Sequence, residues 1–474
     1  MTDSSNGSLL SSGAGAASLF NLDLIRKYDQ AGPRYTSYPT APMFHAGING
    51  ETYAETLNAA GRVDGPLSLY IHIPFCNTIC YYCGCNKIVT KQYERAEPYL
   101  QLLLKEIDLV AEHIGKSRPV TQLHFGGGTP TFLNEDQLRR LMAHLHDQFT
   151  FVSDEEGEYG IEMDPRECSE KTVRVLRETG FNRMSMGVQD FDPDVQKAVN
   201  RIQSKEETLR VLEEARAYGF KSMNIDLMYG LPLQSVETFD RTLSTIIDFS
   251  PDRIALFNYA HLPHMFMPQR RINEEELPSP QQKLDILEHS IKRLLDAGYK
   301  FIGMDHFGKP DDELTIAQSE GKLYRNFQGY STHSDCDLIG IGLTSIGYVG
   351  GSFFQNAKEM DTYSETISAG KFSVFRGYTL TEEDHLRRHV IMRLMCDFSL
   401  DFNAVEKLFD INFKVHFSDA LEDLKPMQKD GLVALQENRL DVLPAGRMLI
   451  RNIAMLFDEH LRKKQEEVRY SKVI

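Results

Sequence analysis

Four of the seven cysteines lie within ten residues, in the stretch CNTICYYCGC. Cys76, Cys80 and Cys83 form a C-x3-C-x2-C pattern, and Cys85 follows two residues later. Three thiolates from one short loop can bind three corners of an iron–sulfur cube and leave one iron open for a substrate or cofactor. Structural zinc is the main alternative, but it usually takes two pairs of ligands separated by a longer spacer. The spacing therefore favours an iron–sulfur cluster.

The remaining composition is that of an ordinary globular protein, and the isolated Cys168, Cys336 and Cys396 are expected to be small buried side chains. A net charge of −16 argues against nucleic-acid binding, which needs Lys and Arg on one face. The chain has no apolar run of the roughly 18 residues that span a bilayer. The first 20 residues lack the basic region of a signal peptide. We therefore expect a cytoplasmic protein without disulfides or membrane contacts.

Six apolar runs alternate with helical segments, which is the pattern of βα units and a parallel sheet. Strands are expected over residues 67–73, 121–125, 159–163, 183–189, 222–230 and 253–259. Helices are expected after five of them: one that opens at Asn134, one capped by Ser235, and three over residues 169–180, 204–218 and 280–297. Parallel βα units close into a barrel or open into a doubly wound sheet, and both place the active site at the carboxyl ends of the strands.

Chemistry-bearing residues collect at these carboxyl ends. The cysteine loop follows the first strand, and GGGTPT (residues 126–131) follows the second. The glycines leave backbone exposed to a ligand, although the dinucleotide and P-loop spacings are absent. Glu162, Gln189 and Asp226 are polar residues in otherwise apolar strands, where burial is costly unless they are paired. Structural pairing explains any one of them, whereas three at one rim favour recognition of hydroxyl or amine groups, such as those of a ribose.

Outside the βα array we expect a flexible tail (residues 1–20), an arm (21–60), a catalytic domain (61–375) and a helical, winged-helix-like domain (376–474). The arm contains GPRYTSYPTAP, which is extended because proline stands near both ends. Its tyrosines either pack onto the main domain or form a lid over a cleft. In an acidic protein, a winged helix is more often a packing or substrate-covering module than a DNA reader.

Several long motifs resemble one known family. They are GPRYTSYPTA, YIHIPFCNTICYYCGCNKIVT, HFGGGTPT, IEMDPRE, MSMGVQDF, NIDLMYGLP, FNYAHLP and GMDHF. The cysteine spacing and GGGTPT resemble the radical S-adenosylmethionine (SAM) superfamily. Within it the chain is similar to the oxygen-independent coproporphyrinogen III oxidases from about Tyr28 to the C-terminus. The related heme chaperones, the alternative function, lack the fourth cysteine and carry H-N-x-x-Y-W, whereas this chain has Cys85 and no tryptophan.

The resemblance implies a partial parallel (β/α)6 barrel and a [4Fe-4S] cluster on Cys76, Cys80 and Cys83, with Cys85 unassigned or catalytic. It implies that a 5'-deoxyadenosyl radical converts two propionates of coproporphyrinogen III to vinyl groups, giving protoporphyrinogen IX for heme synthesis. It implies two SAM molecules. Tyr70, Gly127, Glu162 and Ile346 would line one, and Tyr82, Gly128, Thr129, Gln189, Arg201, Asp226 and Ala260 would line the other.

Two further expectations concern partners. The electron donor would be a protein such as flavodoxin or ferredoxin, and the chain would be a monomer. The four carboxylates of the substrate need basic partners despite the negative net charge, and Arg34 in the arm is the candidate. Arg201 is either a solvated helix residue or an anion partner in the cleft.

Overall fold

The computed structural model describes residues 19–28, 30–333 and 336–463 of the 474-residue chain. The predicted tail over residues 1–20 therefore lies outside the described residues, except for Leu19 and Phe20. Both of these side chains are buried. Within the described part of the chain, no helix is long and apolar enough to cross a membrane.

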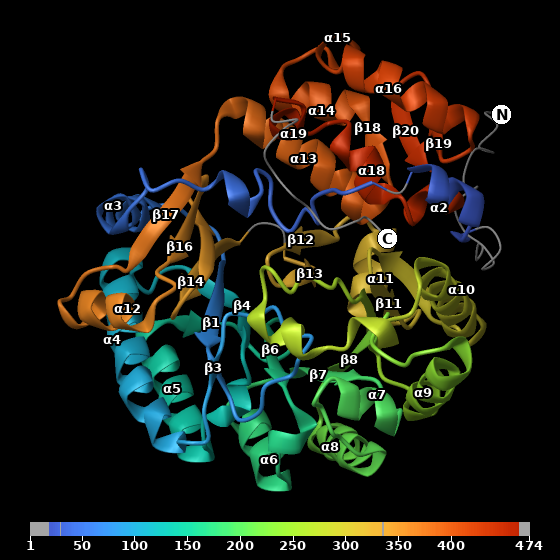
Figure 1. Ribbon diagram of the computed structural model, residues 1–474. Coiled ribbons are helices and arrows are strands. Elements are labelled where there is room, and N and C mark those ends of the chain that lie inside the picture. The colour runs from blue at the N-terminus through green and yellow to red at the C-terminus, as the bar shows by residue number, and fades with distance from the viewer. Residues whose placement is uncertain (1–18, 29, 334–335, 464–474) are drawn as a thin grey trace, which may run out of the picture.

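Six parallel strands form the centre of the molecule, in the order that the sequence predicts (Figure 1). They are β1 (Leu67–Ile73), β4 (Pro119–Gly127), β6 (Glu158–Met163), β7 (Arg183–Gln189), β8 (Ser222–Tyr229) and β9 (Arg253–Asn258). Each lies beside the next one in this series. Helices cover the outer face: α4 (Ala96–Ile114), α5 (Glu135–Gln148), α6 (Glu170–Glu178), α8 (Lys205–Tyr218), α9 (Val236–Phe249) and α10 (Pro280–Asp296). The partial (β/α)6 barrel is confirmed.

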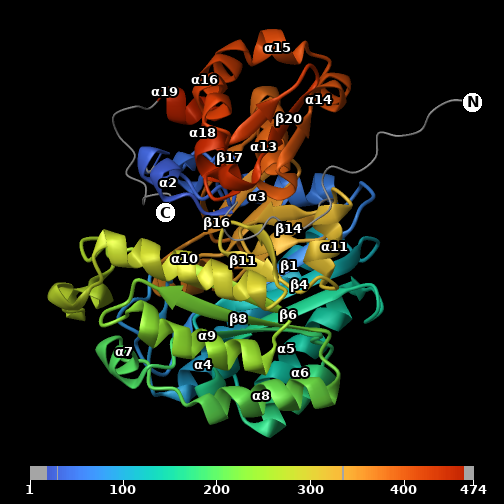
Figure 2. The same ribbon diagram turned by 90° about the vertical axis from the view of Figure 1, so that its right-hand side faces the viewer.

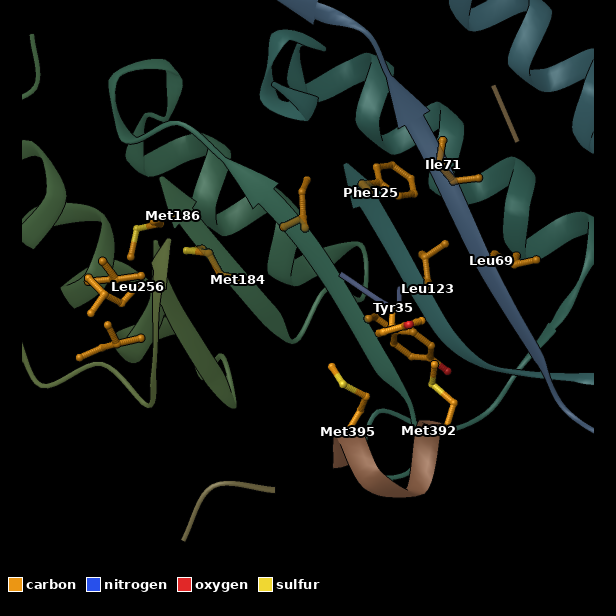
Figure 3. Packing of buried hydrophobic residues seen from close by; sticks show 14 of the residues in the cluster. Tyr35, Leu69, Ile71, Leu123, Phe125, Met184, Met186, Leu256, Met392 and Met395 are labelled. Atoms are coloured by element: carbon orange, nitrogen blue, oxygen red, sulfur yellow. The ribbon is translucent and has the colours of Figure 1, made fainter. Parts of the chain in front are cut away.

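The strands bury apolar side chains toward the helices and direct polar ones to the concave face, because successive residues of a strand point to opposite sides. Leu69, Ile71, Leu123 and Phe125 belong to the buried core (Figure 3). Their strand neighbours on the other face include Tyr70 and His124, which stack on each other. Side-chain caps start α5, α6, α8, α9 and α10. In α5, Asn134 and Gln137 form a capping box.

The sheet extends beyond these strands at both ends. At one end β14 (Asp337–Ile341) pairs parallel to β1, and β15 (Ile346–Val349), β16 (Ser352–Asn356) and β17 (Val374–Thr379) continue it antiparallel. At the other end β11 (His306–Gly308) and β10 (Lys300–Gly303) add antiparallel strands. Because β17 pairs with β16, a boundary between residues 375 and 376 would divide a strand of this sheet.

Short elements complete this part of the chain. They are β2 (Phe75–Cys76), β3 (Ile88–Val89), β5 (Thr150–Phe151), α7 (Pro193–Ala198), α11 (Glu313–Ser319), α12 (Met360–Ser368) and the hairpin strands β12 (Tyr324–Asn326) and β13 (Gly329–Ser331). Residues of the hairpin line a polar cavity together with concave-face residues of β4, β6, β7 and β8. The hairpin therefore covers the concave face of the barrel.

The C-terminal region has the order of helices and strands of a winged helix. Its elements are α13 (Glu382–Asp397), β18 (Ser399–Asp401), α14 (Phe402–Phe409), α15 (Phe413–His416), α16 (Ser418–Lys429), β19 (Val433–Leu435), β20 (Arg439–Val442), α17 (Pro444–Arg447), α18 (Ile450–Met455) and α19 (Glu459–Lys463). The three strands pair in the order β18-β20-β19. β19 and β20 form an antiparallel hairpin. This region lies above the barrel (Figure 2).

The arm does not pack as one unit. Its first helix, α2 (Leu22–Tyr28), lies against the C-terminal region (Figure 2), and the Tyr28 hydroxyl donates to Asp430 over 2.6 Å. Its last helix, α3 (Gly50–Ala60), packs instead against α4 and the edge strands of the main sheet. Tyr35 and Tyr38 between them are buried. The aromatic side chains of the arm therefore pack mainly beneath the C-terminal region.

Candidate active site

The cysteine loop leaves the carboxyl end of β1 and is held at both ends by backbone hydrogen bonds. The Thr129 N–H donates to Phe75 O over 2.7 Å, and the Tyr81 N–H donates to Val199 O over 2.9 Å. The Asn200 side chain donates to Ile79 O over 2.7 Å. The loop is thus tied to the glycine segment on one side and to the residues after β7 on the other.

The thiols of the loop lie in different environments. Burial raises the pKa of Cys76 to about 11, although the Thr129 hydroxyl donates to its sulfur over 3.7 Å. A hydrogen bond from Cys85 lowers the pKa of Cys83 to about 5. Cys80 accepts contacts from the guanidinium groups of Arg201 (3.6 Å) and Arg166 (3.9 Å).

The glycine segment can accept only glycine at two positions. At Gly127 φ is +117°, and a Cβ would lie 2.6 Å from the His72 ring. At Gly128 a Cβ would lie 2.6 Å from Phe75 O, in the backbone that leads into the cysteine loop. Side chains at these positions would close the space beside the cysteines, so the glycines keep backbone open to a ligand.

Glu162 lies beside this segment, at the carboxyl end of β6. It accepts hydrogen bonds from the Gly127 N–H and from His124 Nε2, each over 3.2 Å. Burial opposes its ionisation, but the His124 and Gly127 contacts outweigh that effect and lower its pKa. The His124 ring stacks on Tyr70, whose hydroxyl contacts His72 Nδ1 over 3.0 Å. The result is an ionised carboxylate beside open backbone.

Asp226 and Gln189 provide polar groups on the next strands. Burial and the charge of Glu162 raise the pKa of Asp226 to about 7. Asn224 donates to Asp226 Oδ1 over 2.7 Å, while its own Oδ1 is buried without a partner among the described residues. Gln189 has φ +71°, and its buried Oε1 likewise has no described partner. Two buried oxygen acceptors without a donor among the described residues, beside the Asp226 carboxyl, suit a ligand that carries hydroxyl groups.

Arg201 is not a solvated helix residue. It is buried, follows α7, and donates to Asp164 Oδ2 over 3.1 Å and to the carbonyl of Gly187. Its buried Nε has no partner among the described residues. Its burial contradicts the solvated alternative, and its role as an anion partner in the cleft stays a prediction. Part of its charge is already compensated by Asp164.

The other predicted residues lie around this centre. Ile346, in β15, lies against Gly340, the register partner of Tyr70. Tyr82 packs in a small apolar cluster with Tyr259, and one side chain, Gln269, donates to the carbonyls of both Tyr82 and Ala260. The predicted residues are therefore brought to one rim, with the exception of Arg34.

Arg34 lies at a separate cavity of about 530 Å³ between α10, the ends of β8 and β9, the arm and α18. Its guanidinium pairs with Asp305. Ala260 lines this cavity too, so the cavity reaches the rim at that residue. Arg34 is thus an ion-paired residue beside the rim and not a free cation over the cysteine loop.

Sequence reasoning missed His124, Arg166 and Asn224. His124 and Asn224 each stand two residues before a rim residue on the same strand, Gly126 and Asp226, so the period of two places them on the concave face. Strand alternation could have found both. Arg166 lies in a short turn after β6, and no local pattern predicts its direction toward Cys80.

The residues present fit an iron–sulfur cluster and SAM. The donor set offers three cysteine thiols from one loop, and Cys76 would need a nearby positive charge such as iron to ionise. The glycine cradle and the unpartnered acceptors of Gln189 and Asn224 fit a ligand with an amino-acid part and a ribose. Among residues 19–28, 30–333 and 336–463, no three His, Cys, Asp or Glu side chains converge as for a single metal ion.

Comparison with known proteins agrees with this geometry. The model of the radical SAM superfamily matches residues 70–246, and the model of the HemN C-terminal domain matches residues 380–449. The fold and the cysteine loop together define a radical SAM enzyme, a class whose members use a [4Fe-4S] cluster and SAM.

Curated relatives named oxygen-independent coproporphyrinogen III oxidase are 49% identical in Pseudomonas aeruginosa and in Escherichia coli, each over 96% of this chain. These alignments cover 99% and 98% of the relatives. A solved structure of coproporphyrinogen III oxidase (HemN) from Escherichia coli, described as a radical SAM enzyme, matches with 47% identity and a TM-score of 0.89. It covers 93% of this chain and 99% of that chain. The chain belongs to the family of oxygen-independent coproporphyrinogen III oxidases.

Proposed function

We propose that the chain converts coproporphyrinogen III to protoporphyrinogen IX without oxygen. Each of two propionates loses one hydrogen atom, one carbon dioxide and one electron, and becomes a vinyl group. The observation that carries the proposal is the cysteine loop beside the Gly127–Glu162 rim, in a chain that is 49% identical to curated relatives of that name over nearly their full length. When bound, the reduced cluster and SAM supply the radical that removes the hydrogen atom.

The protein's own residues would bind and orient the cluster and SAM. Cys76, Cys80 and Cys83 would bind the cluster, and Arg166 and Arg201 would stabilise its negative charge. Gly127 and the Glu162 carboxylate would bind the amino group of one SAM molecule. Tyr70 and Ile346 would pack against that molecule.

We infer a second SAM molecule on the remaining rim residues. These are Tyr82, Gly128, Thr129, Gln189, Arg201, Asp226 and Ala260. The unpartnered oxygen of Gln189 and the proton-retaining carboxyl of Asp226 support hydroxyl recognition there. Equilibrium dialysis of cluster-loaded protein against labelled SAM would measure the stoichiometry, and saturation at one molecule would refute the second site.

The electron donor is proposed to be a small redox protein such as flavodoxin or ferredoxin. A monomer without nucleic-acid or membrane partners also stays a prediction.

Anaerobic turnover tests the function. Wild-type protein with SAM and dithionite is expected to release two equivalents of labelled carbon dioxide from coproporphyrinogen III, and Cys76→Ser to release none because the cluster is not bound. Cys168→Ser is the matched control, since this cysteine lies outside the loop. An intact cluster without carbon dioxide release would reject the proposal, and stoichiometric heme binding in that case would select the heme chaperone.

Cys85 is proposed to be catalytic. The residue is exposed, and its thiol hydrogen-bonds to Cys83. Cys85→Ser is expected to keep its iron and sulfide but to lose turnover. A variant that turns over normally would remove Cys85 from the mechanism.

Arg34 stays a candidate for substrate binding. It is already paired with Asp305, so the expected effect of Arg34→Ala on the KM for coproporphyrinogen III is modest, about 10-fold. An unchanged KM would discard Arg34.

A further inference from the structure

Arg325, in β12 of the hairpin, is a buried cation without an acidic partner among the described residues. Only 4% of the residue is exposed, and Nε and Nη1 have no hydrogen-bond partner among the described residues. Its Cζ lies 4.7 Å from the centre of the Tyr330 ring, which holds the plane of the guanidinium and compensates part of the charge. A buried charge that makes no hydrogen bonds to the described residues is costly, so this arrangement favours the binding of an anion.

The guanidinium lines a small cavity between the arm, β12 and α13. The cavity is also lined by Arg388, His333, Thr36 and Ser37, and no described lining residue is Asp or Glu. Arg388 is held by the Tyr324 hydroxyl and by the Tyr348 ring, 4.2 Å from its Cζ.

One carboxylate does lie near this cavity. Glu158 is 3.8 Å from His333 Nε2, but it already accepts hydrogen bonds from Gln122 and Thr332. The cavity therefore presents an excess of positive charge and hydroxyl donors. Its volume of about 20 Å³ accommodates a terminal group and no ring.

This cavity adjoins the larger polar cavity on the concave face. Asn326 lines both of them. The larger one, of about 210 Å³, is lined by Glu162 and Asp226 and is covered by Gln328 and Tyr330 of the hairpin. A ligand next to the reaction rim can thus extend one substituent toward Arg325.

We propose that Arg325 and Arg388 bind a propionate carboxylate of the tetrapyrrole, and that this propionate is one that the reaction retains. The inference rests on the proposed function. A guanidinium pairs with a carboxylate through two parallel hydrogen bonds. Decarboxylation removes the carboxylate charge, so an ion pair on the reacting group would stabilise the substrate more than the transition state. An ion pair on a retained propionate orients the substrate without this cost.

Arg325→Met tests the proposal, because methionine keeps the volume and removes the charge. The KM for coproporphyrinogen III is expected to rise about 10- to 100-fold, more than kcat falls. The iron content is expected to stay unchanged. The Tm of substrate-free protein is expected to stay unchanged or rise, because an unpaired buried charge is removed. Arg139→Met, on the surface of α5, is the matched control. A lowered Tm with an unchanged KM would make Arg325 structural and overturn the proposal.

Two further variants sharpen this test. Arg325→Lys keeps a point charge without the two parallel donors, so it is expected to restore only part of the affinity. Arg325→Met combined with Arg388→Met is expected to cost less than the sum of the single changes, because both side chains bind one carboxylate. Additive effects would assign the two arginines to separate sites and refute the shared one.

A binding measurement separates this inference from the proposed function. Fluorescence titration with coproporphyrin III, which keeps all four propionates, needs no turnover. Wild-type protein is expected to bind it about 10- to 100-fold more tightly than Arg325→Met. Arg325-dependent binding in a protein that releases no carbon dioxide would retain the site and reject the function. Equal binding by both proteins would reject the site.

Discussion

At the scale of single residues, the rim combines two carboxylates in different protonation states. Glu162 is stabilised as an anion by His124 and the Gly127 N–H. Asp226 retains its proton to about pH 7, because it is buried and lies near the charge of Glu162. The Glu162 anion can therefore accept hydrogen bonds from an ammonium group, and the Asp226 carboxyl can share hydrogen bonds with hydroxyl groups.

The raised pKa of Asp226 predicts a pH-dependent stability. The folded state binds this proton more tightly than the unfolded chain, so the contribution is present below about pH 4 and is lost as the pH rises to about 7. Asp226→Asn should therefore gain in Tm relative to wild type between pH 5 and pH 7, by about 2 °C, and then level off. Differential scanning calorimetry of cluster-loaded, SAM-free protein measures this Tm difference as a function of pH.

Asp248→Asn, at an exposed position of α9, controls for the loss of one negative charge. A Tm difference between Asp226→Asn and wild type that does not change with pH would contradict the assigned protonation of Asp226.

At the scale of elements, the turn after β4 connects the two halves of the site. The Gly128 and Thr129 N–H groups bond to Ile73 O (2.8 Å) and Phe75 O (2.7 Å), just before the cysteine loop. The glycine segment and the cysteine loop are therefore one rigid unit, and a distortion of either is transmitted to the other.

Gly127→Ala tests this coupling. The new Cβ would meet the His72 ring at 2.6 Å in a backbone conformation that favours glycine, so the segment must shift. SAM affinity is expected to fall at least about 10-fold, as the loss of one charge-assisted contact would cause. Anaerobic calorimetric titration with SAM measures the loss.

Gly115→Ala is the matched control, because φ is +73° and nothing lies within 4 Å of the new Cβ. Both variants should lose stability, by about 1 kcal/mol in the control, while only Gly127→Ala should lose SAM binding. Equal SAM affinity in the two variants would show that the Gly127 position does not shape the site.

At the scale of the whole molecule, the C-terminal region binds the arm through hydrogen bonds. Arg451 donates to Pro33 O over 2.9 Å and to Gly32 O, and the Tyr35 hydroxyl donates to buried Asp458 over 2.9 Å. Tyr35 belongs to the same buried cluster as Met392 and Met395 of α13 (Figure 3). The arm that carries Thr36 and Ser37 to the Arg325 cavity is thereby positioned by the last elements of the chain.

Tyr35→Phe is expected to weaken the contact between the arm and the C-terminal region. It removes one donor from Asp458, which is almost fully buried, at a cost of about 1–3 kcal/mol. The Tm should fall by about 2–4 °C, and limited proteolysis should cut the arm faster. Tyr218→Phe is the control, because the Tyr218 hydroxyl donates to Glu170 at the surface of α8. Equal losses from both changes would show that the buried contact does not hold the arm.

Local patterns were sufficient for the chemistry and for most of the barrel. The cysteine spacing, the glycine turn and the six apolar runs each depend on residues close together in the sequence, where strand and helix periods are expressed. The strand β14 was missed for the same reason. In the sequence it is a glycine-rich apolar segment, and its place beside β1 is set by pairing between residues such as Leu67 and Asp337, which are far apart in the chain.

The sequence by itself determined which side chains are available at the rim and in what order the parallel strands follow one another. Only the tertiary structure decided their partners. It paired Arg34 with Asp305 and Arg201 with Asp164, and it left Arg325 buried without an anion from the part of the chain that the structure describes. The physical reason is that the charge state and cost of a buried group depend on neighbours from distant segments, which no local period encodes.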